Sequence, residues 1–120
     1  MTTTAKGKKG EDKAVSSLRE RGYRVIARNY RANGGEVDIV AQKDKLLIFV
    51  EVKARAAHTP YKAIEAVTKA KQEKIARAAT QFIKEKSPKF DGIRFDVVCV
   101  LAEVNIVHVM GAFSPKRTTL

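Results

Sequence analysis

The sequence has one cysteine, no tryptophan and three prolines among its 120 residues. Cys99, in the apolar run FDVVCVL, has no partner for a disulfide and cannot form a thiolate metal cluster. We therefore expect a buried thiol in a reducing, cytoplasmic protein. The only two histidines, His58 and His108, lie far apart in the sequence, which argues against a histidine metal site.

Long apolar segments are also absent. Runs such as LLIFV, residues 46–50, fall far short of the roughly 18 residues that a membrane-spanning helix needs. The N-terminus MTTTAKGKKG has lysines with no apolar stretch after them, unlike a secretory signal. We expect no membrane partner and a cytoplasmic location.

Acidic residues are few compared with basic ones. The chain carries 24 Lys and Arg against 13 Asp and Glu, a formal net charge of +11. A positive field of this size attracts polyanions such as nucleic acids, although a basic protein without such a partner has the same composition. The length suits one domain with one core.

Hydrophobic periodicity predicts an α/β protein with a single domain over residues 11–110. We expect a flexible basic N-terminus, residues 1–10, before this domain. After it we expect a polar tail, residues 111–120, whose segment SPKRTTL is disordered. The expected elements are a helix over 11–21, strands over 23–31, 36–42 and 46–54, a helix from Thr59-Pro60 to about Lys86 with a break near Thr68, and strands over 94–101 and 104–110. This order predicts a mixed sheet of about five strands with a helix on each side.

The second and third expected strands carry charged residues where apolar ones would normally pack. Residues two apart on a strand share a face, so Glu36 lies with Asp38, and Glu51 with Lys53. If residues 44–45 form a two-residue hairpin loop, Asp38 stands directly across from Glu51. Like charges at that position, with Cβ atoms roughly 4.5–5.5 Å apart, are unfavourable.

A divalent cation would compensate for this repulsion. Mg²⁺ prefers oxygen ligands and takes one or two carboxylates, so Asp38 and Glu51 are candidate ligands, with Mn²⁺ as a substitute metal. Lys53 would then stabilise charge in a transition state, or activate water after its pKa is lowered. The alternatives are acids that are solvated or paired with surface lysines, and a bulge that separates Asp38 from Glu51.

The same residues resemble a known nuclease pattern. GEVDIV followed by FVEVKAR resembles the D…ExK core of the PD-(D/E)XK nuclease superfamily. The larger series resembles the YraN family of uncharacterised bacterial proteins, which is similar to archaeal Holliday-junction resolvases. Its matching pieces, between residues 9 and 100, are KGEDKA, GYRVIARNYR, GGEVDIVA, FVEVKAR, AVTKAKQEKI and RFDVVCV.

This resemblance implies a restriction-endonuclease-like core with Asp38 and Glu51 as metal ligands and Lys53 as the catalytic lysine. Glu11 would reach the same cleft from the first helix as a further ligand. Val37 stands where the superfamily nominally has a proline. The implied activity is metal-dependent hydrolysis of DNA, with branched or structured DNA as one class of substrate, and a resolvase-like enzyme can act as a homodimer.

Two other functions fit the same residues. A nuclease fold without catalysis would be a nucleic-acid-binding module, since fold does not settle function. A basic surface can also bind acidic surfaces of partner proteins.

Several further polar residues are candidate contacts to nucleic acid. Asn29 and Arg31 share strand parity, and they either bind a phosphate or form a solvated strand edge. Lys71 and Gln72 either orient the nucleic-acid backbone or a metal-bound water, or belong to the solvated face of a helix. The set is completed by Arg55.

Two acids have expected supporting roles. Glu36 is expected to support the site through a salt bridge with Arg31 or Arg55. Asp96, in the last hairpin, is expected to make a structural contact.

Overall fold

The structure, a computed structural model, describes residues 3–32, 34–54, 60–102 and 105–115. Its elements are α1 (Thr3–Glu20), β1 (Arg24–Ala32), β2 (Gly35–Lys43), β3 (Leu46–Ala54), α2 (Pro60–Glu65), α3 (Lys69–Lys86), β4 (Gly92–Ala102) and β5 (Asn105–Val109). The expected order of helix, three strands, helical segment and two strands is confirmed.

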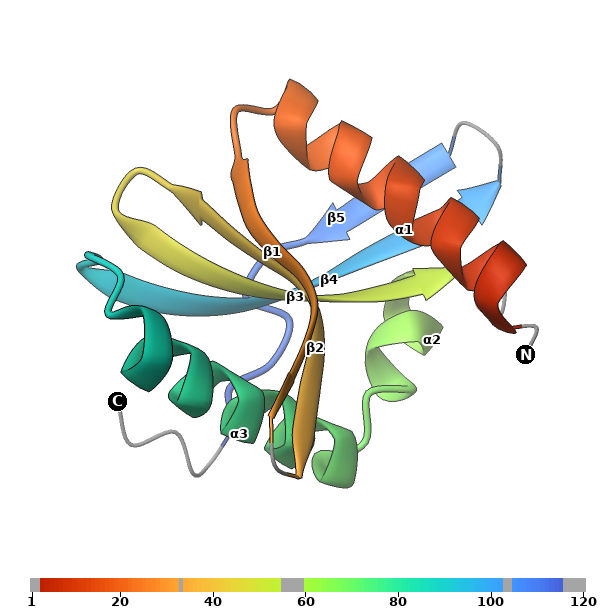
Figure 1. Ribbon diagram of the computed structural model, residues 1–120. Coiled ribbons are helices and arrows are strands. Elements are labelled where there is room, and N and C mark those ends of the chain that lie inside the picture. Colours follow the sequence, from red (N-terminus) through yellow and green to blue (C-terminus); the bar gives the residue numbers. More distant parts are fainter. Residues whose placement is uncertain (1–2, 33, 55–59, 103–104, 116–120) are drawn as a thin grey trace.

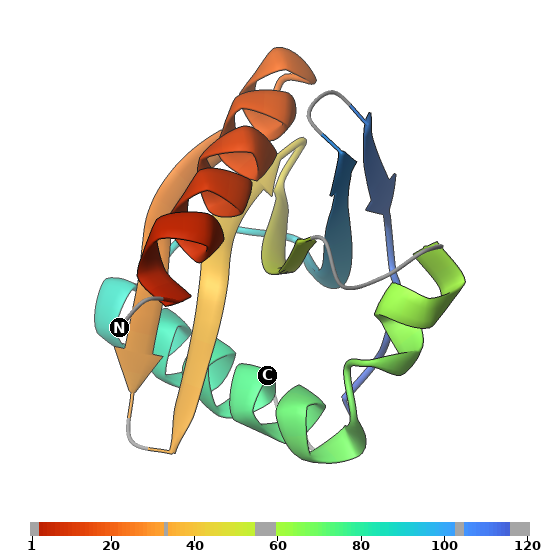
Figure 2. The same cartoon turned by 90° about the vertical axis from the view of Figure 1, so that its right-hand side faces the viewer.

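One five-stranded sheet, in the order β1-β2-β3-β4-β5, organises the fold. β3 and β4 are parallel, whereas the other neighbouring pairs are antiparallel. Parallel neighbours need a long crossover connection, and α2 and α3 provide it. Figures 1 and 2 show α1 on one face of the sheet and α3 on the other, as the sequence predicted.

Each face of the sheet has its own apolar cluster. Phe49, Phe82 and Phe95 pack in the cluster that contains α3, and Leu18 and Ile48 in the cluster that contains α1. Successive side chains of a strand point to opposite faces, so β3 contributes to both clusters. Its residues 47–50 are fully buried, which agrees with its central place in the sheet.

The hairpin between β2 and β3 has the predicted two-residue loop. Asp44 and Lys45 have positive φ values of 50° and 70°, as a tight hairpin loop with the right twist requires. Lys43 pairs with Leu46, which sets the register of the two strands. The predicted register of β2 and β3 is therefore present from Lys43 to Ile39, and the pairing ends one position before Asp38.

The long helical pattern breaks where the sequence predicted. Thr68 caps the N-terminus of α3, because its side-chain oxygen accepts a hydrogen bond from the backbone N–H of Lys71 at 3.2 Å. The break separates α2 from α3. No helix within the described ranges is long and apolar enough to cross a lipid bilayer.

Two expectations about the ends of the chain are wrong. α1 begins at Thr3 rather than Glu11, so residues 3–10 are helical, because an established helix extends cooperatively through a polar segment. After β5 the chain packs back on the sheet, where the N–H of Ala112 donates to the carbonyl oxygen of Phe95 and the Phe113 ring lies 5.5 Å from the Phe95 ring. Pro115 of the expected disordered tail is buried, while residues 116–120 lie outside the described ranges.

Gly35 allows β2 to approach α3 closely. A Cβ atom at this position would lie 2.3 Å from the carbonyl oxygen of Lys74 and 2.8 Å from the amide nitrogen of Ala78. Both atoms belong to the backbone of α3 and cannot move aside independently. The start of β2 is therefore fixed beside the segment of α3 from Lys74 to Ala78.

We expect Gly35→Ala to lower the free energy of unfolding by about 1–3 kcal/mol, because the added methyl group overlaps backbone atoms. Urea unfolding followed by circular dichroism measures this loss. Gly92→Ala is the matched control, since its Cβ would meet only the flexible end of the Leu46 side chain at 3.0 Å. Equal losses in the two variants would contradict the close approach.

Candidate functional site

Glu51 and Lys53 lie on the face of the sheet that α3 covers, because they share the parity of Phe49, which belongs to the cluster with α3. Asp38 lies where the alternation of β2 breaks, since Val37 and Val40 both belong to that cluster and Ile39 belongs to the other. The structure therefore brings Glu51 and Lys53 together on one face, and the Asp38 carboxylate comes close to Glu51 by a different route.

The geometry at the end of the β2–β3 pairing sets the position of Asp38. The paired residues run from Lys43–Leu46 to Ile39–Val50. At the next position the side chain of Asp38 reaches across, and its Oδ2 accepts a hydrogen bond from the backbone N–H of Val52 at 2.8 Å. This bond fixes the Asp38 carboxylate against β3, close to Glu51.

The carboxylate of Glu51 is buried and incompletely satisfied. The residue is 4% exposed. Its Oε2 lies 3.6 Å from the Nζ of Lys53 and 3.7 Å from the Nζ of Lys71, while its Oε1 is buried without a hydrogen-bond partner. Most buried polar atoms have such a partner, so this oxygen indicates a place where a further ligand can bind.

Burial raises the pKa of both acids, and the charge of a neighbouring acid adds to it, Asp38 for Glu51 and Glu11 for Asp38. Burial raises the pKa of Glu51 to about 7, the charge of Asp38 adds to this, and Lys71 and Lys53 oppose it. Burial also raises the pKa of Asp38, against the Val52 hydrogen bond and the charge of Lys71. Perturbed acids of this kind are frequent at functional sites, because a bound cation or a proton can relieve the repulsion.

Lys71 joins the acids from the first turn of α3. Its Nζ lies 3.5 Å from Oε2 of Glu36, in addition to its contact with Glu51. Burial lowers the pKa of Lys71, but the charges of Glu51, Glu36 and Asp38 outweigh this and the net shift is upward. Glu36 also pairs with Arg31 at 3.6 Å, which is one of its two expected partners.

Glu11 lies near the pair but is held by other residues. It is 7% exposed, and its Oε1 accepts hydrogen bonds from Arg28 at 2.9 Å and from Asn29 at 3.0 Å. Its charge contributes to the raised pKa of Asp38. Within the described residues, however, no group of three or more His, Cys, Asp or Glu side chains is arranged to hold a metal ion. The role of Glu11 as a third ligand stays a prediction.

Sequence reasoning missed Arg28. The pairing of β1 with β2 is irregular between Val25 and Ala27, which breaks the simple alternation of the strand. Arg28 stands opposite Ile39, whose side chain belongs to the cluster with α1, so its guanidinium reaches Glu11. A strict two-residue period could not reveal this contact.

The other residues predicted to contact nucleic acid differ in their exposure and in their partners within the protein. The amide of Gln72 donates to the carbonyl oxygen of Val67 at 3.1 Å, beside the start of α3. Arg31 keeps an 80% exposed side chain next to Glu36. Asn29, with a φ of 50°, donates to Glu11, and Arg55 lies outside the described residues. Contact between these residues and nucleic acid remains a prediction.

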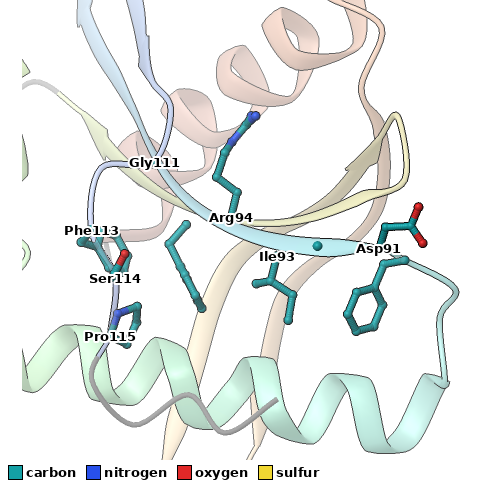
Figure 3. A pocket seen from close by; sticks show the side chains of 10 residues that line it. Asp91, Ile93, Arg94, Gly111, Phe113, Ser114 and Pro115 are labelled. Atoms are coloured by element: carbon teal, nitrogen blue, oxygen red, sulfur yellow. The ribbon is translucent and has the colours of Figure 1, made fainter.

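Asp96 makes the structural contacts expected of it, away from the acidic pair. It is fully buried, accepts hydrogen bonds from Arg94 and from the N–H of Gly111, and lies 2.7 Å from the Nε2 of His108. These bonds fasten β5 and the following turn to β4. Figure 3 shows a hollow beside this region, formed by the start of β4 and residues 111–115, which shares no residue with the acidic pair.

The raised pKa of Glu51 predicts a stability that depends on pH. The pKa of Glu51 rises from 4.5 to about 7 on folding. Its contribution to the free energy of unfolding is therefore fully present below pH 4.5 and is lost as the pH rises through 7. Glu51→Gln removes the charge. In EDTA, we therefore expect urea unfolding to find the variant more stable than the wild type at pH 8, by on the order of 2–3 kcal/mol, with a much smaller difference at pH 4.

Glu73→Gln is the control for this measurement, because Glu73 is an exposed acid on α3 and its loss changes the net charge equally. It should give no comparable dependence on pH. A difference between Glu51→Gln and the wild type that is the same at both pH values would argue against a charged, buried Glu51.

Comparisons with known proteins agree with the motifs. The model of "Uncharacterised protein family UPF0102" matches residues 10–100. A UPF0102 protein of Sulfurihydrogenibium sp. strain YO3AOP1 is 44% identical over 114 residues, which cover 95% of this chain and 98% of that protein. One of Kosmotoga olearia is 43% identical over 106 residues, covering 88% of this chain and 90% of that protein.

Among solved structures, that of Pyrococcus furiosus SfsA in complex with Ca²⁺ matches 83% of this chain and 62% of its own, with 15% identity. The TM-score of 0.34 is too low to say anything about function. The match to the family model and the long alignments with its members are decisive: the chain belongs to the uncharacterised protein family UPF0102, the YraN-like family that its ordered motifs resemble.

Proposed function

We propose that the protein is a metal-dependent nuclease that hydrolyses phosphodiester bonds in DNA. The observation that carries the proposal is the buried Glu51 carboxylate, with one unpartnered oxygen, between Asp38 and two lysines. Burying two neighbouring carboxylates is costly unless cations or hydrogen-bond donors compensate their charge, and a bound metal ion would do so. The net charge of +11 favours a polyanionic substrate.

The donor set fits Mg²⁺, with Mn²⁺ as a substitute. Asp38 and Glu51 would hold the ion, since Mg²⁺ takes one or two carboxylates and leaves its other positions to water and phosphate. The unpartnered Oε1 of Glu51 supplies a free oxygen for it. When bound, the ion would add positive charge beside the phosphate and make water more acidic.

One backbone group, the N–H of Val52, and one side chain, that of Lys53, would prepare the reaction. The N–H of Val52 holds Asp38 in position, because it donates to the carboxylate. Lys53 is 26% exposed, so its ammonium can face both Glu51 and an incoming phosphate. There it would stabilise the negative charge that develops on the phosphate oxygens, or, once deprotonated, accept a proton from the attacking water.

Cleavage of nicked, flapped and four-way DNA in Mg²⁺ or Mn²⁺ tests this function. We expect Asp38→Asn and Glu51→Gln to lower the rate on the order of 10²-fold or more, because each removes an oxygen charge at the reacting centre. Glu73→Gln should cut as fast as the wild type. The proposal fails if no substrate is cut, or if cutting survives the loss of both acids.

Lys53→Arg separates the two roles of the lysine. Arginine keeps the charge but cannot lose its proton in a protein. A rate retained within about tenfold by Lys53→Arg and lost by Lys53→Gln would indicate charge stabilisation. Loss in both variants, with the fold intact, would favour a role as a base.

A second candidate function is nucleic-acid binding without catalysis. It is favoured by the two lysines that already neutralise part of the acidic charge, and by the lack of a three-ligand group among the described residues. Binding would then need no metal. The logarithm of the binding constant would fall by roughly 0.9 per phosphate contact for each tenfold increase in salt concentration. Glu51→Gln would leave the affinity unchanged or improve it, which fluorescence anisotropy with labelled DNA can measure.

A further inference from the structure

Lys71 takes part in the acidic site through one long hydrogen bond, which it donates to Glu36, and an ion pair with Glu51. Its Nζ lies 3.5 Å from Glu36 and 3.7 Å from Glu51, longer than the 2.7–2.9 Å or so that is usual between an ammonium and a carboxylate. Asp38 adds a third negative charge to its surroundings. The ammonium therefore balances the charge of a group of acids rather than locking onto one of them.

The position of Lys71 on its helix is electrostatically unfavourable by itself. It belongs to the first turn of α3, whose N-terminal end carries a partial positive charge and favours acids. The first turn of α3 contains no acid. The contacts with Glu36 and Glu51 stabilise the Lys71 ammonium at this place, and the contact with Glu51 would weaken if another cation neutralised Asp38 and Glu51.

The Lys71 side chain is more exposed than the Glu51 carboxylate. Its side chain is 28% exposed and reaches the site from α3, while Glu51 is 5% exposed and Asp38 is held by the N–H of Val52. Glu36, with a 46% exposed side chain, lies at the outer side of the ammonium. Release from Glu51, with the contact to Glu36 kept, would leave the charge of Lys71 at the rim of the site.

We propose that Lys71 is the resident counterion of the acidic pair and exchanges with the divalent cation. When the metal binds Asp38 and Glu51, the ammonium leaves Glu51, keeps its contact with Glu36 and binds a phosphate of the substrate. This inference rests on the proposed function, since it names a residue that links metal binding to substrate binding at the same site. Lys71 is then a positioning residue for the phosphate, and no bond of the substrate is broken by it.

Calorimetric titration of the full chain with MnCl₂, without DNA, tests the exchange. We expect Lys71→Gln to bind Mn²⁺ about tenfold more tightly than the wild type, because the metal no longer displaces a charge about 4 Å from its ligands. Lys71→Arg keeps the charge and should bind no more tightly than the wild type. Lys74→Gln, an exposed residue one turn along α3, removes a charge of the same sign and should leave the affinity unchanged.

The second measurement follows the substrate. With metal present, the KM for DNA should rise about tenfold in Lys71→Gln, while the Mn²⁺ concentration that gives half of the maximal rate falls. A structural role alone would move both quantities in the unfavourable direction. Thermal unfolding of each variant confirms that the comparison is between folded proteins.

The outcomes separate this inference from the proposed function. If Lys71→Gln binds Mn²⁺ no better than the wild type, or if Lys74→Gln gains as much, Lys71 is not the counterion, although a wild type that cuts DNA would still be a nuclease. An unchanged KM for DNA would overturn the phosphate-binding step. If neither the wild type nor Lys71→Gln takes up metal, both the exchange and the metal-dependent nuclease are overturned.

Discussion

The burial of two neighbouring carboxylates is the constraint on which the site depends. Removing charge from water is costly unless opposite charge accompanies it, and here the opposite charge comes from two elements. β3 supplies Lys53 and α3 supplies Lys71, so the site is complete only when the helix rests on the sheet. The close approach at Gly35 brings that helix near enough for the contact to form.

Much of this arrangement follows from local rules that a sequence reveals. A two-residue loop at residues 44–45 fixes the register of β2 and β3, and that register brings Asp38 near Glu51. Thr68 marks the start of α3 through ordinary capping chemistry. Such signals act over a few residues, so they can be read without knowing the fold.

The parts that the sequence did not reveal depend on packing between distant segments. The contact of Lys71 with Glu36 and Glu51 depends on how α3 crosses the sheet, which no local pattern specifies. The irregular pairing of β1 turns Arg28 toward Glu11, against the simple alternation. Helical structure before Glu11 also escaped prediction, because helix extension is cooperative and its polar residues give no periodic signal.

The mixed pairing of the sheet has a consequence for the order of assembly. β1, β2 and β3 are joined by short hairpins, whereas β3 meets β4 only after the intervening helices have been made. Contacts that close short loops form faster than contacts that close long ones, so the three-stranded meander is favoured early in folding. A nascent chain would thus bring its two acids together before Lys71 could dock opposite them. Until the helix arrives both carboxylates are open to water, which screens their repulsion, so the cost of burying them arises only in the step that also supplies the Lys71 ammonium.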